Sequence, residues 1–486
     1  MKHALAHALA MLQEARGSTA PTISAHNGAG FALGASGSSG ARVRPAHLVA
    51  WCVPGLPVAA LGLPLVVYLP PYYAGTLGLP LATVGFIFAL VRLIDIPLDP
   101  LFGALMDNTR SRFGQFRPWM VGGAFFLMLG AWLLFMAQPG VTAIATFMAL
   151  FVLYLGFSCM NLSQVAWGSR LSGDYGERAR IFGVWTTFNV FGTLTVLLIP
   201  PVLGWVSPGA TESAGVQAMG WFIIVLAPLS VIAAALIVPE GEAPVGDHRV
   251  RIADVRAVLA DRRMARLLAV DLLIAIAPGV TGALFIFLFT AVLNFPLATA
   301  SALLLAYFVA GLVAAPLWIR LARAWGKHKA TALAAAWFGI AQIGILVVPL
   351  GNIHYAVVAM VIAGIPFAAP AFLLRAMMAD LNDAQTLDRQ IANTPGADTT
   401  GLNFAILTAT AKLGYAIPVG LTYPILGLIG FDPVPGAENS RAALDGLRWL
   451  FALPPFLLGL SAAVVIWGWP ITANVHADIR ARLHNP

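Results

Sequence analysis

Residues 92–119 decide the fold and read RLIDIPLDPLFGALMDNTRSRFGQFRPW. This stretch starts inside an apolar run that begins near Leu79, and it ends in a burst of arginines. An apolar run of about 20 residues is long enough for a helix to cross a bilayer. The sequence therefore places Arg92, Asp95 and Asp99 well inside a membrane-crossing segment, and the arginines at its end.

Arg92, Asp95 and Asp99 fall on one stripe of that helix, because they are spaced i, i+3 and i+7. A charge at this depth costs at least ~2.5 kcal/mol, so such charges normally face a bundle interior or a wet cavity. Two carboxylates one helical turn apart also repel each other unless a cation or proton joins them. The stripe is therefore a candidate for binding a positive charge.

Two prolines loosen the backbone beside these charges. Pro97 and Pro100 lack the amide hydrogens that would otherwise bond the carbonyls of Leu93 and Ile96. Two acids, a base and loosened carbonyls on one stripe are typical of a cation or proton site. The alternative is a neutralised ion pair that holds two helices together.

The composition indicates a polytopic membrane protein. Of the 486 residues, 59% are hydrophobic and 10% are charged, and the mean hydropathy is +0.84. Soluble domains carry roughly 25% charged residues. The net charge of +7 lies in short loops, where it reports orientation rather than nucleic-acid binding. Cys52 and Cys159 lie in apolar stretches and imply no disulfide framework.

Apolar spans recur about twelve times along the chain, which predicts an all-α protein with twelve transmembrane helices. Their centres lie near residues 60, 94, 127, 155, 192, 228, 279, 308, 341, 366, 416 and 458. Basic residues cluster after the even-numbered spans, as with Arg170 after the fourth and Arg320 after the eighth. The positive-inside rule then predicts that both termini are cytoplasmic.

The longest middle connection divides the spans six and six. Pro100-Leu-Phe before one basic loop has a weak counterpart in Pro316-Leu-Trp before another, which favours two similar halves. We expect a disordered cytoplasmic extension, a six-helix bundle, a cytoplasmic central loop, a second six-helix bundle and a cytoplasmic tail. Their predicted ranges are residues 1–46, 47–239, 240–264, 265–472 and 473–486.

The turn after the second span carries Gly103, Asp107, Arg110, Arg112 and Arg117. The interpretation we favour is a conformational latch, in which Asp107 and the arginines pair across helix ends in one conformation only. The alternative is an ordinary basic loop that fixes the topology.

Residues 48–472 resemble the major facilitator superfamily, and residues 92–119 resemble its glycoside–pentoside–hexuronide:cation symporter family of melibiose permease-like carriers. The family pattern R-x-x-D-x-x-x-D-P-x-x-G matches residues 92–103, and T-x-S-R-x-G-x-x-x-P-W matches residues 109–119. Further matches in family order are DYGER, ADLND and KLG at residues 174–178, 379–383 and 412–414. The resemblance implies the major facilitator fold and alternating access between its two halves.

By this resemblance Asp95 and Asp99 are the two cation-site carboxylates, and Lys412 is a helix-eleven lysine close to them. Lys412 is also the only charge in an otherwise apolar span, so it needs an acidic partner. Arg92 and Lys412 together neutralise the two acids, which a buried and mostly dry site requires.

The resemblance also bears on the coupling ion. Ser158 retains a helix-four hydroxyl of the family, whereas Leu98 stands where the family's sodium site has a polar residue directly before the second acid. Sodium binds through several hard oxygen ligands, so the loss of one favours the proton. We expect no metal ion and no other cofactor.

For the solute, Asn161 occupies the helix-four position where the family carries a sugar-binding acid, and an amide can still donate and accept hydrogen bonds. Trp185 stands at the place of a helix-five arginine, with packing against lipid or the core as its alternative. Gln164 and Tyr72 are further polar candidates for the cavity, and Tyr72 has a membrane-interface role as its alternative.

The sequence thus predicts a secondary active transporter in a bacterial-type inner membrane, monomeric in the lipid bilayer. It performs cation-coupled symport of a glycoside or related small polar solute, with the proton favoured. The rivals are a proton-coupled exporter or carrier of a non-sugar solute, and a non-transporting membrane sensor. A sensor could shed the buried charges at a gain in stability, which argues against it. No nucleophile–base pair, ATPase motif or metal-ligand spacing points to an enzyme.

Overall fold

The computed structural model describes residues 42–484 except 110, 173, 208–210, 241–255, 257 and 392–399. Arg42–Pro486 form one compact unit, and its described residues fold into helices without any strand. Most of the predicted N-terminal extension, residues 1–41, lies outside the described residues, as does most of the predicted central loop. These two domain assignments stay predictions.

The first membrane span is an irregular helix. Five prolines between residues 54 and 71 remove backbone donors, and the span accordingly alternates between α-helical and π-helical turns. Its pieces are α2 (Pro45–Cys52), α3 (Gly55–Gly62), η1 (Pro64–Tyr68), α4 (Leu69–Pro71) and η2 (Tyr72–Thr76). The rest of the first half is regular and consists of α5 (Leu81–Asn108), α6 (Arg117–Phe135), α7 (Ala143–Ser169), α8 (Tyr175–Val206) and α9 (Glu212–Ile237).

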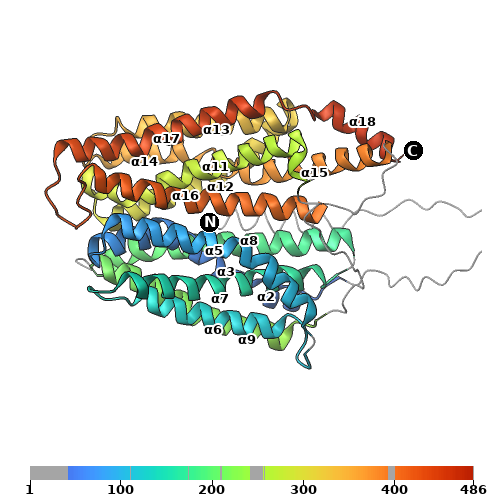
Figure 1. The fold of residues 1–486 in the computed structure, drawn as a ribbon, viewed down its shortest axis with the longest axis horizontal. Helices are drawn as coiled ribbons and strands as arrows, with labels where there is room; N and C mark the ends of the chain where they lie inside the picture. Colours follow the sequence, from blue (N-terminus) through green and yellow to red (C-terminus); the bar gives the residue numbers. More distant parts are fainter. Residues whose placement is uncertain are drawn as a thin grey trace, which may run out of the picture. The chain divides into compact units, whose positions relative to one another are not determined.

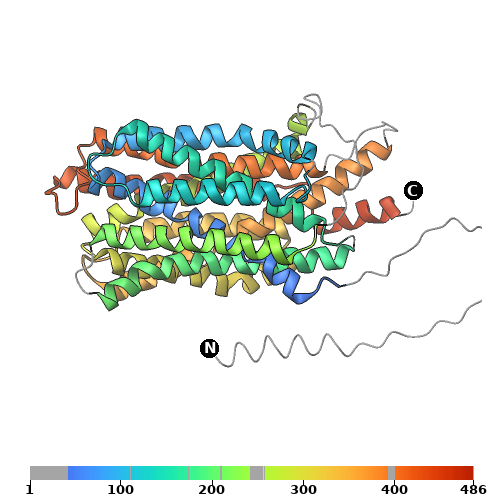
Figure 2. The same cartoon turned by 90° about the horizontal axis from the view of Figure 1, so that it is seen from below.

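The second half repeats this layout and adds a short terminal helix. Within the compact unit its helices, yellow to red in Figure 1, run alongside those of the first half, blue to green. Figure 2 shows the same helices turned by 90°, again running side by side. They are α11 (Arg262–Phe287), η3 (Leu288–Val292), α12 (Leu297–Trp325), α13 (Lys327–Ile345), α14 (Ile353–Gly364), α15 (Ala369–Ile391), α16 (Thr400–Leu428), α17 (Arg441–Trp467) and α18 (Ala473–His484).

Among the described residues, 11 helical segments are long and apolar enough to cross a membrane. One of these segments, Ile353–Ile391, contains both α14 and α15. Helix α13 is not among these segments, but it covers the predicted ninth span, centred near residue 341, and it begins with the basic residues Lys327 and Lys329. With α13 included, the described helices reproduce the predicted order of twelve spans, and the predicted fold class is confirmed.

The two halves meet along α5 with α16, along α8 with α12, and along the irregular first span, whose η1 and α4 contact α11. At the contact between α5 and α16 the two helices approach closely. A Cβ atom on Gly85 would lie 2.9 Å from the carbonyl oxygen of Val419, and one on Gly420 would lie 2.6 Å from the Cβ of Ala89. Small residues allow such an approach between membrane helices. It brings the polar stripe of α5 to face α16.

The motif at residues 174–178 caps the start of α8. The Asp174 carboxylate caps that helix by accepting from the Glu177 amide at 2.7 Å. The Glu177 carboxylate in turn accepts from the Val43 amide at 3.1 Å and from Arg180 at 2.5 Å. The motif at residues 174–178 therefore fixes the start of α8 and ties it to the segment just before the first span.

Candidate cation and solute site

The carboxylate of Asp95 is the centre of a polar cluster between the halves. Its side chain is only 1% exposed. Ser158 of α7 donates to Oδ1 at 2.7 Å, and Nζ of Lys412 in α16 lies 2.9 Å from Oδ2. Arg92, one turn earlier in α5, places Nη1 at 3.7 Å from the same Oδ2. The structure thus brings together four of the five residues predicted for cation coupling.

The fifth residue, Asp99, joins the cluster through Lys412. Nζ of Lys412 contacts Oδ2 of Asp99 as well as Asp95, so one ammonium group serves both carboxylates. Oδ1 of Asp99 is buried and has no hydrogen-bond partner among the described residues. This side chain is 23% exposed, which makes it the more accessible of the two acids. Asp99 therefore has spare capacity to bind a proton or another donor.

Arg92 belongs to the polar cluster around Asp95 and also lines the cavity between the two halves. Its guanidinium lies 4.8 Å from the centre of the Tyr154 ring, a cation–π contact that orients the side chain. Tyr154 did not emerge from the sequence. It lies four residues before Ser158 and hence on the same face of α7, and this spacing is the sequence signal that would have identified it.

A cavity of about 330 Å³ lies between the two halves. Cavities of ~300–1,000 Å³ are the usual size for small-molecule sites. Among the described residues that line it, Arg92 is the one charged side chain. Most of the wall comes from the second half, whose aromatic side chains there are Phe285, Tyr307, Phe308, Phe367, Tyr415 and Phe451. Sequence reasoning missed this wall, although Tyr415 lies one turn after Lys412.

The four residues predicted to bind solute lie outside the lining of this cavity. Gln164 is fully buried and its amide donates to the Trp51 carbonyl at 2.8 Å. Tyr72 is also buried, and its hydroxyl donates to the Ala137 carbonyl at 3.4 Å. Trp185 packs with its ring centre 6.4 Å from that of Trp51, and Asn161 is half-buried in α7. Their role in solute binding stays a prediction.

The predicted latch residues lie at the end of α5 and in the turn that follows. Arg117 donates to the carbonyl of Val238 at 2.7 Å, just past the end of α9. Arg112 is exposed, with its guanidinium 4.7 Å from the centre of the Phe113 ring. Arg110 lies outside the described residues, and Asp107 and Gly103 belong to α5. The contact of Arg117 joins two helix ends within the first half, and the latch stays a prediction.

The same turn is closed by the segment after α9. Gly114 has a φ of +105°, which favours glycine. Oε1 of Glu240 accepts from the Gln115 amide at 2.8 Å and from the Phe116 amide. Arg170 of the loop after α7 donates to Oε1 of Gln115 at 2.6 Å. The turn is therefore bound to α7 and to the end of α9.

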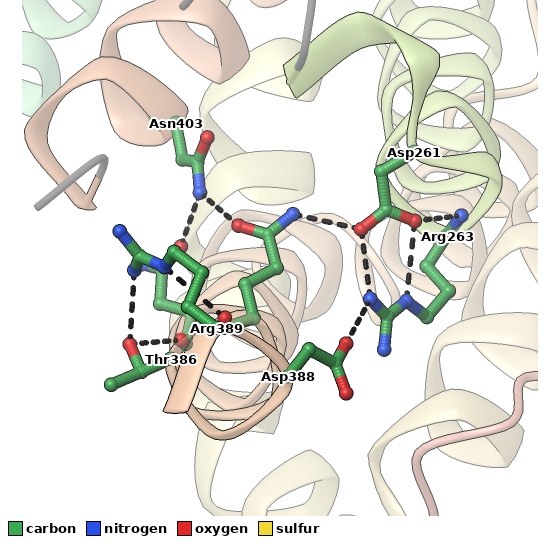
Figure 3. Close-up of polar contacts among 8 residues, drawn as sticks. Asp261, Arg263, Thr386, Asp388, Arg389 and Asn403 are labelled. Atoms are coloured by element: carbon green, nitrogen blue, oxygen red, sulfur yellow. Dashed lines mark hydrogen bonds and ion pairs between the residues drawn. The ribbon is translucent and has the colours of Figure 1, made fainter. Parts of the chain in front are cut away.

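A polar network joins α11, α15 and α16 at one end of the second half (Figure 3). Asp261 caps α11 by accepting from the Arg263 amide at 2.8 Å, and it also accepts from Gln385 at 2.9 Å. Arg263 pairs with Asp388 at 2.7 Å, and Asn403 donates to Gln385 at 2.8 Å. Burial alone would raise the pKa of Asp261, but the hydrogen bonds from Arg263 and Gln385 hold it below its ordinary value.

The matched motif at residues 379–383 supplies a second set of polar contacts at this end. Nζ of Lys327 in α13 lies 2.6 Å from Oδ2 of Asp380 in α15. Nε2 of His476 in α18 lies 2.9 Å from Oδ2 of Asp383 and 3.5 Å from Oδ1 of Asp380. These contacts hold α13, α15 and α18 together.

Comparison with known proteins agrees with this architecture. Residues 50–473 match the family described as MFS/sugar transport protein. The glucuronide carrier protein homolog of Escherichia coli (strain K12) is 24% identical over 429 residues, covering 86% of this chain and 91% of that protein. The uncharacterized symporter YnaJ of Bacillus subtilis (strain 168) is 31% identical over 158 residues, covering 32% of this chain and 33% of that protein. The chain thus spans about a third of that relative's length in the match.

A solved structure, the D-xylose-proton symporter, has the same fold. Its TM-score is 0.61 at 16% sequence identity, covering 88% of this chain and 98% of that one. The matched proteins are membrane transporters rather than enzymes, and the apolar helices make this chain a multi-pass inner-membrane protein. The chain therefore belongs to the MFS/sugar transport family, within the glycoside–pentoside–hexuronide:cation symporters of the major facilitator superfamily.

Proposed function

We propose that this protein is a proton-coupled symporter that moves a small polar solute across the membrane by alternating access. The observation that carries the proposal is the position of Lys412, which comes from the second half and contacts both Asp95 and Asp99 of the first. Arg92 belongs to this cluster and also lines the cavity between the halves. The residues that could bind a proton are thus in contact with those that could bind solute.

The charges of the cluster supply a coupling mechanism. With both carboxylates ionised, Arg92 and Lys412 balance them. An added proton leaves the cluster with a net positive charge, so the proton binds well only when a base moves away or an anion arrives. Because Lys412 lies on α16 and the acids lie on α5, a rearrangement of the two halves changes the affinity for the proton. That differential affinity links proton binding to the change of state.

The surroundings of the acids favour the proton over sodium. Both oxygens of Asp95 are already in use, since Oδ1 accepts from Ser158 and Oδ2 faces Lys412. Leu98 offers no side-chain oxygen at the position before Asp99. Sodium requires several oxygen ligands around a single point, whereas a proton requires one.

We place both termini in the cytoplasm and the functional unit in a single chain. Basic residues follow the even-numbered spans, which is the distribution of cytoplasmic loops. One chain supplies the walls of the cavity from both halves, which supports a monomer as the functional unit.

Proteoliposomes containing the purified full-length protein test the coupling ion. Uptake of labelled lactose, D-xylose and D-glucuronate is measured under an imposed pH gradient and, separately, under an imposed sodium gradient. We expect accumulation of a transported solute under the pH gradient and its loss when a protonophore is added. Accumulation that follows the sodium gradient and ignores the protonophore would rule out the proton.

A further inference from the structure

One acid of the second half lacks a close partner inside its membrane span. Asp271 of α11 is half-buried, and its Oδ2 is buried without a hydrogen-bond partner among the described residues. It lies about 13 Å along the helix from Arg262, the first residue of α11. A carboxylate at such a depth is costly unless a base or a hydrogen-bond donor attends it. Asp271 would therefore gain from a base that another arrangement of the helices brings to it.

The groups around Asp271 do not supply that base in this structure. Arg375 of α15 acts on it electrostatically, but Arg375 is exposed and its Nη1 donates to a carbonyl of its own helix at 3.3 Å. Arg266 of α11 donates to two carbonyls at the end of α17, at 2.6 and 2.7 Å. The first span brings Tyr68 and no charge to its contact with α11. Helix α17 also packs against α11, but its charges lie near its opposite end, at Arg441, Asp445 and Arg448.

Tyr415 of α16 connects Asp271 with a base of the first half. Tyr415 is 42% exposed and lines, together with Arg92, both the central cavity and a smaller one of about 40 Å³. The charged groups that act on Tyr415 are Asp271, Arg92 and Arg375. Pro278 of α11 lines the cavity, and Asp271 lies seven residues earlier, on the same face and about 10 Å nearer the start of the helix. Arg92 and Asp271 thus approach one space from opposite halves.

Arg92 is the base that can be released from the cluster around Asp95. Its Nη1 lies 3.7 Å from Oδ2 of Asp95, whereas Nζ of Lys412 lies 2.9 Å from the same atom. Ser158 donates to the other oxygen at 2.7 Å. Asp95 therefore keeps two partners without Arg92. A proton on Asp95 removes the charge that attracts the guanidinium.

We infer that Asp271 is the alternative partner of Arg92, and that their ion pair closes the cavity on the side of Asp271 once a proton has neutralised Asp95. This inference rests on the proposed function and assigns a further residue to its conformational step. Arg92 belongs to the first half and Asp271 to the second, so their pairing draws the halves together toward the start of α11. In the orientation proposed above, that is the cytoplasmic side.

The count of charges favours this exchange of partners. The set holds three bases and three acids, which are Arg92, Lys412, Arg375, Asp95, Asp99 and Asp271. In this structure two bases attend Asp95 while Asp271 has no base in contact. After one proton has bound to Asp95, Lys412 keeps Asp99 and Arg92 pairs with Asp271. The net positive charge that results is left on Arg375, which is exposed. Protonation and closure therefore favour each other.

Alkylation of a cysteine between the halves measures the closure in the purified full-length protein. Thr408 of α16 is exposed and lies on the face of Lys412 and Tyr415, nearer the start of the helix. Asp95→Asn stands for the protonated acid, and we expect it to slow the reaction of Thr408→Cys with a maleimide about fivefold. Adding Asp271→Asn should restore the fast reaction. Asp271→Asn without Asp95→Asn should leave the reaction rate unchanged, which a merely structural role of Asp271 does not predict.

Two further variants make the result specific to the pair. Arg92→Gln, added to Asp95→Asn, removes the other member and should restore fast labelling equally. With Asp271→Asn also present there should be no further gain, because the pair is already absent. Asp445→Asn is the matched control, since it makes the same change in a side chain that is 63% exposed. Labelling of the Asp95→Asn protein should stay slow with this control.

The inference is overturned if Asp95→Asn does not slow the labelling, or if Asp271→Asn or Arg92→Gln fails to restore it. It is also overturned if the effects of these two variants add, if Asp271→Asn changes the labelling equally without Asp95→Asn, or if Asp445→Asn restores the labelling as well. The labelling needs neither a solute nor an ion gradient. A failure here therefore leaves the proposed function to be decided separately by the uptake experiment.

Discussion

Nζ of Lys412 in α16 lies 2.9 Å from Oδ2 of Asp95 in α5, so an ion pair joins the two halves of the chain. The Asp95 side chain is 1% exposed. Breaking a buried pair so that one charge is left without its partner costs ~3–5 kcal/mol. The halves therefore separate at this point readily only when the carboxylate is neutralised or keeps another cation.

Replacing either acid by its neutral isostere should uncouple transport. We expect Asp95→Asn and Asp99→Asn each to abolish accumulation against a gradient, because the variants can no longer exchange a proton at that position. Counterflow of solute between equal concentrations should survive, since the fold keeps its helix contacts. Both quantities are measured in proteoliposomes, and uphill accumulation by the double variant would exclude these acids from coupling.

The cap of α11 should give the protein a pH-dependent stability. The pKa of Asp261 is lowered in the folded protein by hydrogen bonds, so its contribution is present above the unfolded pKa and is lost as the pH falls through the folded pKa. Asp261→Ala should cost about 1 kcal/mol at neutral pH. The difference from the unmodified protein should shrink below about pH 4.

Thermal unfolding in detergent at a series of pH values measures this difference. Asp478→Asn is the control, because the Asp478 side chain is 60% exposed and its pairing with Arg482 contributes little. If Asp261→Ala lowers the stability equally at neutral and acidic pH, the predicted pH dependence of the Asp261 cap is wrong.

The turn after α5 should tolerate only glycine at residue 114. A Cβ atom there would lie 1.5 Å from Oε2 of Glu240, and the φ of +105° is unfavourable for other residues. We expect Gly114→Ala to destabilise the protein by about 2 kcal/mol. Gly122→Ala in α6 is the control, since a Cβ atom there meets nothing within 4 Å. Equal melting temperatures for the two variants would refute the prediction.

Cysteine labelling checks the orientation. Gln138 between α6 and α7 and Glu438 between α16 and α17 are exposed, and both should react from outside intact cells as Gln138→Cys and Glu438→Cys. Lys329→Cys, in an exposed position at the start of α13, should react only after permeabilisation. The native Cys52 and Cys159 are buried and give little background. A reversed pattern would place the termini outside.

The clustering of Arg92, Asp95, Asp99 and Lys412 was predictable, because the spacing along a helix and the isolation of a charge in an apolar span can both be read from the local sequence. The i, i+3 and i+7 spacing put Arg92, Asp95 and Asp99 on one face, and an isolated lysine in an apolar span requires an acid. The contact of Lys412 with both acids follows from these two constraints and the pairing of α5 with α16.

The cavity wall was not predictable in the same way. Phe308 and Phe367 belong to apolar helices in which many similar side chains face lipid or neighbouring helices, and the sequence does not tell these apart. Gln164 and Tyr72 were predicted to bind solute but lie outside the cavity lining. A polar side chain in an apolar span can instead donate a hydrogen bond to a nearby backbone carbonyl, as both of these do. Which side chains line an internal space depends on how the two halves are placed against each other.

Gly85 and Gly420 let α5 and α16 approach closely, with Gly85 near the carbonyl of Val419 and Gly420 near the small side chain of Ala89. Interdigitated side chains would have to leave one set of rotamers and enter another whenever the helices shifted. A contact between small groups involves fewer such changes, so we expect α5 and α16 to shift against each other with little loss of packing at this point. In the transport cycle that we propose, the main resistance to this movement is the ion pair of Asp95 and Lys412, and protonation of one carboxylate then controls the turnover rate.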